Sequence, residues 1–315
     1  MTELAPQELR VLVAVAETGG FSAAANRLGI TQSAVSHSVR GSEAKVGAVL
    51  FDRGRTGASP TPAGERAVAL GRRILRLYEV LGAEARAAGR APAGPAAADG
   101  VLRIAAFRSA ALHLLPPALE RLTARHPGIR PEVRVVRELG AGTAGEVAAG
   151  RADLAIATLG APGDVPPAGG SAGPSTGQPS GLPSGLPDGL LSGELTREAY
   201  SLVHPFGHPD PKALPLLDWD ENCGSYTRNW WRAQDWIPRA TVKAEDDAMV
   251  LTMVGRGLGM AILPELSLRE ATDAVEIAGL GPEGPVRCVG YVTTPELAST
   301  LAVRALIREL RADRG

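Results

Sequence analysis

The chain has 315 residues, of which 44% are hydrophobic, and a formal net charge of -1. This length is enough for two or three domains with a buried core. Because no run of about 18 apolar residues occurs and the N-terminus lacks the basic and apolar segments of a signal peptide, we expect a cytoplasmic protein without a membrane span.

The charge is distributed unevenly along the chain. Residues 1–90 carry 12 Arg or Lys and 8 Asp or Glu, and residues 27–76 carry 9 basic and 3 acidic side chains. This local positive field suits contact with phosphates. Arginine outnumbers lysine 30 to 3, which favours bidentate contacts, although a genome-wide preference for arginine is the simpler cause.

A helix is predicted from Pro6 to Glu17, with one apolar face made of Leu9, Leu12, Val13 and Ala16. A second, alanine-rich helix follows from Phe21, with Ser22 as its N-cap and Gly29 at its end. Thr31 caps a third helix that begins at Gln32. Two short helices joined by a turn that contains Gly are typical of a helix-turn-helix, whose second helix enters the major groove of DNA.

The third helix has two different faces. Val35, Val39 and Val46 recur at helical spacing and are expected to point inward. The outward face is expected to contact base edges and phosphates, and it consists of Gln32, Ser33, Ser36, His37 and Arg40. Taken singly, such polar faces are usually solvated scaffold, so the order of the pieces carries the prediction.

A small hairpin is predicted after this helix. The segments Leu50 to Arg55 and Ala58 to Thr61 flank a Thr56-Gly57 turn. The hairpin carries Arg53 and Arg55 and is expected to form the wing of a winged helix-turn-helix.

A family resemblance follows from these motifs: Phe21-Ser22-Ala23-Ala24-Ala25, Thr31-Gln32-Ser33-Ala34-Val35-Ser36, Leu50-Phe51-Asp52-Arg53 and Thr61-Pro62-Ala63-Gly64. The chain resembles the LysR-type transcriptional regulators over its whole length, apart from one low-complexity insert. The resemblance implies a winged helix-turn-helix at residues 1–62 that binds double-stranded DNA through Ser22, Thr31, Gln32, Ser33, Ser36, His37, Arg40, Arg53, Arg55 and Thr61.

The sequence departs from the family pattern at Gly41-Ser42-Glu43, where the family usually has an apolar residue before Glu. Ser42 is in register with the inward valines, so it removes an apolar contact, and Gly41 in a helix interior costs about 1 kcal/mol relative to Ala. We therefore expect a DNA-binding domain that is less stable than usual but keeps its outward face.

A long helix is predicted from Pro62 to about Arg90. Its apolar positions approximate a heptad seam, formed by Ala67, Leu70, Ile74, Leu77, Leu81, Ala85 and Ala88. Four arginines of this helix are expected elsewhere on the surface: Arg66, Arg72, Arg73 and Arg76. Residues 63–90 thus form a linker helix, and Leu70, Ile74, Leu77 and Leu81 are its predicted dimer contacts, in agreement with the family, which forms dimers and commonly tetramers.

Residues 91–100 are a predicted Pro/Gly/Ala hinge. Strands are then expected at Val101–Ala106, Glu132–Val136 and Asp153–Ala157, alternating with helices at Leu114–His126 and around Gly145–Ala149, a pattern typical of a parallel α/β sheet. The resemblance, carried here by Gly150 to Ile156 and Met253 to Pro264, implies a periplasmic-binding-protein-like effector domain over 101–315, with two lobes joined by crossing strands.

Residues 160–193 differ from the rest of this domain. Of these 34 residues, 10 are Gly, 7 are Pro and 5 are Ser, and Ser180-Gly181-Leu182-Pro183 repeats directly. Such a composition cannot bury a core and predicts a flexible insert. It acts either as a solvated linker or as a lid over a pocket.

Candidate effector contacts follow from the resemblance. Ser109 precedes a helix and suits a carboxylate or another anion, and the family implies further contacts at Thr158, Ser225, Asp247 and Ala248. Simple capping and strand-end roles remain open for Ser109 and Thr158. The four tryptophans, Trp219, Trp230, Trp231 and Trp236, either fill a core or line an aromatic pocket.

Other functions receive less support. Cys223 lies where peroxide-sensing relatives place a reactive cysteine, but no second cysteine lies nearby to resolve it. Gly255, Gly257 and Gly259 lack the spacing of a dinucleotide fingerprint, and prolines after His204 and His208 forbid the helix that a metal pair would need. We expect no enzyme and no cofactor apart from a small-molecule effector; a receptor without a role in transcription stays open, as does a contact with RNA polymerase.

Overall fold

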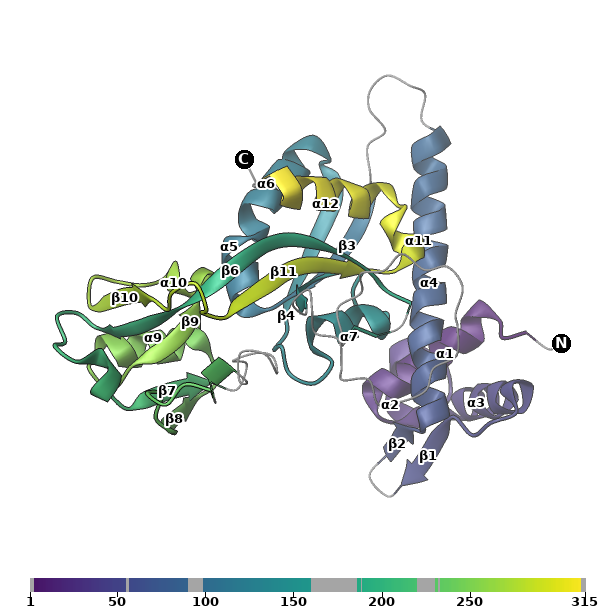
Figure 1. Cartoon of the computed structure of the whole chain (residues 1–315). Coiled ribbons are helices and arrows are strands. Elements are labelled where there is room, and N and C mark those ends of the chain that lie inside the picture. The colour runs from purple at the N-terminus through teal and green to yellow at the C-terminus, as the bar shows by residue number, and fades with distance from the viewer. Residues whose placement is uncertain are drawn as a thin grey trace, which may run out of the picture.

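The chain folds into a helical N-terminal domain, one long helix and a two-lobed α/β domain (Figure 1). The computed structural model describes residues 3–54, 57–89, 99–159, 186–187, 189–219, 230–231 and 233–312. Among these residues, no helix combines the length and apolar character needed to cross a bilayer.

The N-terminal domain contains three helices and one hairpin: α1 (Pro6–Thr18), α2 (Phe21–Leu28), α3 (Gln32–Val46), β1 (Phe51–Gly54) and β2 (Gly57–Pro60). The two strands pair antiparallel, which confirms the wing. The core joins Leu12 and Val15 of α1 with Val35 and Val39 of α3. Val11 and Ala14 are also buried, so α1 buries more of its circumference than the single predicted face.

Two local predictions in this domain are wrong. The N-cap of α2 is Gly20, and Ser22 lies exposed in the first turn. The helix itself begins at Phe21, as predicted, and the Phe21 ring packs edge-on against Phe51, with ring centroids 6.5 Å apart. Val46 is 47% exposed because the last turn of α3 extends past the core cluster.

The long helix α4 (Pro62–Gly89) confirms the prediction from Pro62 to about Arg90. Its first half packs on α1, with Gly71 against Leu9, and Leu77 and Val80 pack on the core of the α/β domain. The arrangement in Figure 1 therefore places α4 between the two domains.

The first lobe is built on a mixed sheet. β3 (Asp99–Ala106) pairs parallel with β4 (Gly128–Val135) and β5 (Leu154–Leu159), as predicted. β11 (Val286–Thr293) lies antiparallel between β5 and β6 (Leu191–Pro205), so the sheet is not purely parallel.

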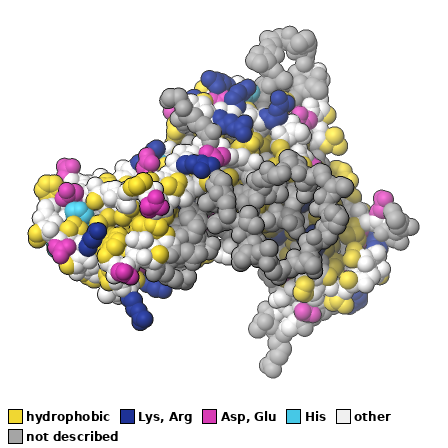
Figure 2. Space-filling model, viewed as in Figure 1, with side chains coloured by type: hydrophobic (Ala, Val, Ile, Leu, Met, Phe, Trp, Pro, Cys, Tyr) yellow, Lys and Arg dark blue, Asp and Glu magenta, His cyan; other side chains and the backbone are white. Residues whose placement is uncertain are grey.

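Helices cover the sheet of the first lobe. They are α5 (Arg108–His113), α6 (Leu115–Arg125), α7 (Gly142–Ala148), α11 (Pro295–Ala298) and α12 (Leu301–Ala312). The single helix predicted from Leu114 to His126 is α6 alone, preceded by the separate α5. Arginines gather over α6 and α12 (Figure 2), where Arg121, Arg125 and Arg308 approach the buried Glu309.

The second lobe begins where β6 leaves the first. β6 pairs there with β9 (Ala261–Pro264) and β10 (Val275–Gly279), while β7 (Leu216–Trp219) and β8 (Ala240–Ala244) form a separate parallel pair. The remaining elements are η1 (Pro211–Ala213), α9 (Asp247–Gly255) and α10 (Glu265–Leu268). β6 and β11 are thus the expected crossing strands.

Several segment boundaries differ from the predictions. β3 starts at Asp99 and takes the last two residues of the predicted hinge, whose residues 91–98 lie outside the described residues. Residues 160–185 and 188 of the predicted insert also lie outside them, but Leu190 is buried and residues 191–193 belong to β6. Trp219 and Trp231 are buried, and Trp230 and Trp236 pack against the same lobe's core, as the core alternative predicted.

Candidate DNA interface and effector cleft

The helix α3 has a defined start and an exposed polar face. Thr31 Oγ1 accepts a hydrogen bond from Ala34 N at 3.2 Å, which confirms the predicted cap. Val35, Val39 and Ser42 are fully buried. On the opposite side Gln32, Ser33, His37 and Arg40 are exposed, and Ser36 is half-buried.

Ser42 is accommodated in the core by its own helix. Its hydroxyl donates to the carbonyl of Ser38 at 2.9 Å, so the buried oxygen is satisfied. Ser42 thus occupies an inward position of α3, as predicted, and its buried hydroxyl is not left without a hydrogen-bond partner.

Glu43 fixes the position of α3 relative to the wing, a role that local sequence patterns did not reveal. Its carboxylate accepts hydrogen bonds from Leu50 N at 2.9 Å and Phe51 N at 3.3 Å. At the other side of α3, Lys45 Nζ donates to Glu8 at 2.7 Å. The helix α3 is therefore anchored both to β1 and to α1.

The wing lies close to Gly19, the residue that follows α1. Ala58 N donates to Gly19 O at 2.8 Å, and Gly57 has a φ of 135°. A Cβ atom at Gly57 would overlap the Gly19 carbonyl, so glycine is required there. Arg53 lies in β1, whereas Arg55 lies outside the described residues.

Thr61 has a structural role in the same region. Its hydroxyl donates to Val49 O at 2.8 Å and accepts from Gly64 N at 3.0 Å, so it caps α4 and joins it to the segment before the wing. Ser22 and Thr61 therefore stay predictions as DNA contacts, although Ser22 is exposed.

The helix α4 leaves one apolar stripe open to solvent. Leu70 is 44% exposed, Ile74 42%, Tyr78 52% and Leu81 64%. Leu77, predicted to lie on this stripe, instead packs partly against the core of the first lobe. Tyr78 takes its place on the exposed face.

Charged side chains on the other face of α4 hold the first lobe. Arg76 donates to both carboxylate oxygens of Asp153, at 2.7 and 2.8 Å, and to Val101 O at 2.6 Å. Asp153 also accepts from Arg103 N at 2.8 Å. The expectation that Arg72 and Arg76 lie on the surface is wrong, because their side chains are only 14% and 13% exposed. Burial opposes the charge of Arg76, but the contacts with Asp153 and Glu79 raise the pKa of Arg76.

Two of the predicted effector residues meet in a cleft between the lobes. Ser109, in the first turn of α5, and Asp247, in the first turn of α9, line it together with Trp219 and Glu138. Ser109 is 3% and Asp247 7% exposed. The cleft therefore joins residues from both lobes.

An ion-pair network fills this cleft. Arg108 donates to Asp247 at 3.0 Å and to Glu270 at 2.8 Å, and Ser267 donates to the second oxygen of Asp247. Burial opposes the charge on Arg108, but its hydrogen bond to Glu270 and the charge of Asp247 raise the pKa of Arg108. The free space is about 20 Å³, room for about one water molecule. The two lobes are therefore in direct contact here, through Arg108 of the first lobe and Asp247 and Glu270 of the second.

The other predicted effector residues are less directly placed. Thr158 N donates to Glu138, a residue of the cleft, at 3.2 Å, and the buried Thr158 Oγ1 has no partner among the described residues. Ala248 is half-buried in the first turn of α9 but does not line the cleft. Ser225 lies outside the described residues.

Sequence reasoning predicted Ser109 and Asp247 but missed four other polar residues of the cleft, three of them charged. Arg108, Glu138, Ser267 and Arg287 all line it, yet they come from four distant segments. Only Arg108 offered a signal, since it directly precedes Ser109. Arg287 pairs with the buried Glu198, whose carboxylate also accepts from Leu266 N at 2.6 Å.

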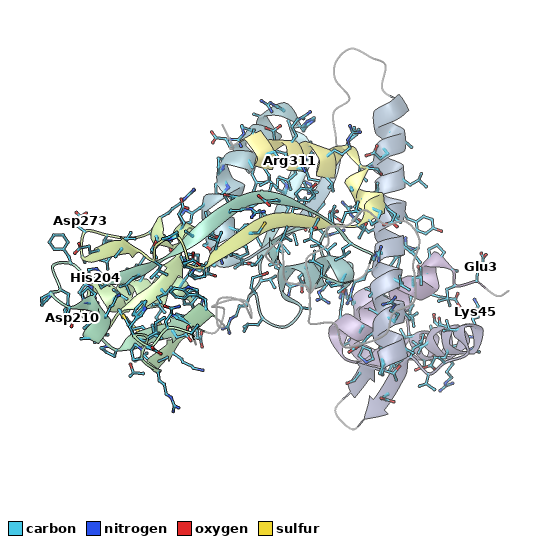
Figure 3. All side chains as sticks on the ribbon, in the orientation of Figure 1. Glu3, Lys45, His204, Asp210, Asp273 and Arg311 are labelled. Atoms are coloured by element: carbon cyan, nitrogen blue, oxygen red, sulfur yellow. The ribbon has the colours of Figure 1, made fainter. Side chains whose placement is uncertain are left out.

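The structure gives no support to a reactive cysteine or a histidine metal site among the described residues. Cys223 lies outside the described residues, and Cys288 is buried in β11. Figure 3 shows His204, Asp210 and Asp273 at the end of the second lobe, far from Lys45 of α3. His204 lies in the extended β6 with Nδ1 3.1 Å from Pro205 O, and within the part of the chain that the structure describes no cluster of metal-ligating side chains forms.

Comparison with known proteins assigns both domains. A family described as bacterial regulatory helix-turn-helix protein, lysR family, matches residues 6–65, and the LysR substrate binding domain matches residues 95–167 and 178–314. The probable HTH-type transcriptional regulator LrrA of Synechococcus elongatus is 32% identical over 266 residues, which cover 82% of this chain and 81% of that protein.

Solved structures share the fold over the whole chain. Full-length CbnR complexed with its target DNA has a TM-score of 0.60 at 19% identity, covering 98% of this chain and 99% of that one. Full-length LysG from Corynebacterium glutamicum with bound effector Arg has a TM-score of 0.60 at 21% identity, covering 97% and 98%. The chain therefore belongs to the LysR family and is a DNA-binding transcriptional regulator with an effector-binding domain.

Proposed function

We propose that this regulator reads its operator through the exposed face of α3 and holds the flanking phosphates with the wing. The observation that carries this assignment is the capped α3, whose buried valines and anchored Glu43 fix its outward Gln32 and His37. Rigid placement of a helix is what base readout in the major groove requires. Arg40, Arg53 and Arg55 supply sequence-independent attraction.

Two copies are proposed to assemble through the exposed stripe of α4. Leu70, Ile74, Tyr78 and Leu81 recur at steps of four, four and three residues, which is helix-seam spacing. Their exposure on a helix between two domains leaves an apolar surface that a second α4 would cover. The dimer would place two winged helices at a fixed spacing on DNA, and pairs of dimers would give a tetramer.

The effector is proposed to bind between the lobes, at Ser109, Thr158 and Asp247. Binding must displace the contacts of Arg108 with Asp247 and Glu270, because they occupy the cleft. The arginine released in this way would pair with an anionic group of the ligand. Opening the lobes would then change the spacing of the winged helices and so the contacts with DNA.

The working place of such a regulator would be the cytoplasm, and RNA polymerase is the further protein partner that we propose.

Footprinting on the DNA upstream of the protein's own gene tests the central proposal. Wild-type protein should protect a discrete site, and Gln32→Ala should lose discrimination between that site and random DNA. Arg40→Ala should instead weaken binding to both and reduce the salt dependence. Binding that is only salt-sensitive and sequence-blind in the wild type would favour a receptor without a role in transcription.

A thermal-melt screen of metabolites tests the effector site. A ligand that binds only the native state at about 100 times its Kd stabilises it by about 2.7 kcal/mol. Stabilisation that Ser109→Ala abolishes would support the cleft, and a ligand whose effect survives that substitution would contradict it.

A further inference from the structure

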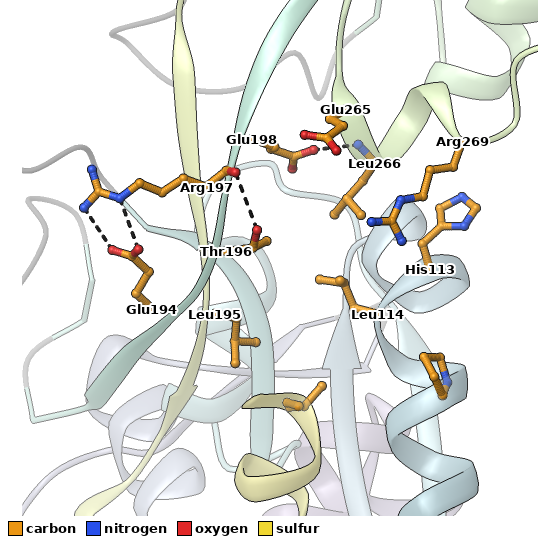
Figure 4. A pocket seen from close by; sticks show the side chains of 12 residues that line it. His113, Leu114, Glu194, Leu195, Thr196, Arg197, Glu198, Glu265, Leu266 and Arg269 are labelled. Carbon is orange, nitrogen blue, oxygen red and sulfur yellow. Dashed lines mark hydrogen bonds and ion pairs between the residues drawn. The ribbon is translucent and has the colours of Figure 1, made fainter. Parts of the chain in front are cut away.

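A larger cavity lies at the junction of the lobes, apart from the cleft described above. Its volume is about 680 Å³, within the range of small-molecule sites. Its walls come from α5, α6, β6, α10 and α12 (Figure 4). None of its lining residues lines the cleft that contains Ser109 and Asp247.

One side of this cavity is apolar. Leu114, Pro117, Leu195, Leu266 and Leu310 line it, and all but Pro117 belong to or pack against the core of the first lobe. An apolar group of a ligand placed against these side chains would be removed from water, and this burial favours binding.

Some charged residues of the cavity are already engaged. Arg197 donates to both oxygens of Glu194, at 3.1 and 2.9 Å, and Figure 4 shows this pair directed away from the cavity. Glu198 is held by Arg287 and Leu266 N. These side chains therefore already have partners of opposite charge or backbone donors.

Two exposed charges remain available, at the first residue of α10 and directly after its end. Arg269 and Glu265 lie one helical turn apart and line the same cavity. Among the residues that the structure describes, neither forms an ion pair or side-chain hydrogen bond. Figure 4 shows the Arg269 guanidinium beside His113, over the apolar wall.

His113 adds an unused polar atom at this place. Its Nε2 is buried and has no hydrogen-bond partner among the described residues. Burial lowers the pKa of His113 below its ordinary value. A buried unpaired nitrogen costs free energy that a ligand oxygen or N–H group would recover.

We propose that this cavity is a second ligand site, which binds a small organic acid with an apolar body. The carboxylate pairs with Arg269 and contacts His113, and the apolar body covers the leucines. Glu265 disfavours a second negative group and accepts the ammonium group if the acid is an amino acid. This inference goes beyond the proposed function, because it assigns a site outside the cleft and does not depend on DNA binding.

Titration calorimetry on the full chain tests the site with three compounds that share one apolar body: 3-phenylpropanoate, 3-phenylpropanamide and phenylalanine. The acid should bind, and the uncharged amide should bind at least about tenfold more weakly, since a charge-assisted hydrogen bond contributes about 1.5–3 kcal/mol. Arg269→Gln should weaken the acid by a similar factor.

A matched control and a second variant complete the experiment. Arg256→Gln removes another exposed arginine of the same lobe that does not line the cavity, and it should bind the acid like the wild type. Glu265→Gln should weaken phenylalanine and leave or improve 3-phenylpropanoate if the amino group is recognised. Equal effects on both compounds would assign the site to simple acids.

Three results would overturn the inference: no binding of any compound, equal binding of acid and amide, or unchanged affinity in Arg269→Gln. Loss of binding in Ser109→Ala with retention in Arg269→Gln would also overturn it, because the acid would then occupy the cleft. That last outcome supports the proposed function, so the two proposals fail separately.

Discussion

At the scale of single residues, two glycines of the DNA-binding domain have opposite consequences. A Cβ atom at Gly64 would overlap the carbonyl oxygen of Leu50, whereas the nearest atom to a Cβ at Gly41 is a Glu8 oxygen at 3.9 Å. Gly64→Ala should therefore destabilise the protein by about 1–3 kcal/mol. Gly41→Ala should stabilise it by about 0.4–1 kcal/mol, because only unfolded-chain entropy changes.

Urea unfolding followed by circular dichroism would measure both changes. The two variants add the same methyl group to helices of the same domain, so each serves as the control for the other. Equal shifts of the unfolding midpoint would contradict the prediction.

Local chemistry determined which site residues could be predicted from sequence. Thr31 and the outward face of α3 follow from capping and helical spacing alone, and the structure has them as expected. Ser22 failed as a cap because the helix already begins at Phe21, which makes the preceding Gly20 its N-cap. Arg108 and Glu43 were missed because their partners, Asp247 and Leu50, are set by the fold.

At the scale of elements, the exposed stripe of α4 predicts an assembly. Leu70→Asp together with Leu81→Asp should give monomers, since charges would face each other in the apolar seam. Light scattering on the purified protein measures the mass. Leu258→Asp changes an equally exposed leucine, 55% accessible, outside α4 and should leave the mass unchanged. A double variant with the wild-type mass would remove the seam from the proposal.

The length of α4 could be predicted from sequence, but the exact seam could not. A straight helix has 3.6 residues per turn and drifts from a 3.5-residue heptad. Over Leu70 and Ile74 the drift is small, but one turn later Tyr78 replaces Leu77 on the open face. Leu77 turns inward because the first lobe offers it a core.

The helix α7 predicts a dependence of stability on pH. Glu146 is 8% exposed and accepts from Arg151 at 2.7 and 2.8 Å. The hydrogen bond from Arg151 lowers the pKa of Glu146 below its ordinary value. This carboxylate therefore stabilises the fold above its unfolded pKa of about 4.3, and that stabilisation is lost as the pH falls through its folded pKa.

Unfolding of the wild type and Glu146→Gln at several pH values tests this dependence. The difference between their free energies of unfolding should be largest near pH 7 and should shrink below about pH 4. A difference that stays constant across this range would show that the charge of Glu146 is not responsible.

At the scale of the whole molecule, Arg76 joins the linker helix to the first lobe. Arg76→Met leaves Asp153, which is 1% exposed, without its counter-charge and should destabilise the protein by about 3–5 kcal/mol. Arg73→Met, on the same helix, breaks a more exposed pair with Glu296 at 3.4 Å and should cost less than about 1 kcal/mol. Equal losses in urea unfolding would mean that the Arg76 contact does not fasten the domains.

The two-lobed plan was expected only through family resemblance. Periodicity identified β3, β4 and β5, which follow one another with helices between them. It could not place β11 between β5 and β6, because strand pairing over such a distance in the chain leaves no local signal. The antiparallel β11 is what makes the sheet of the first lobe mixed.

The position of β11 also sets the order in which the chain can fold during synthesis. The winged domain is complete once the first turns of α4 have left the ribosome, since its core uses residues no later than Val68. The first lobe needs Val286–Thr293 to close its sheet and Leu301–Ala312 to cover it. A ribosome stalled before residue 286 would therefore carry a folded DNA-binding domain and an effector domain that cannot yet fold. The two domains can act as one regulated molecule only after β11 and α12 have been synthesised.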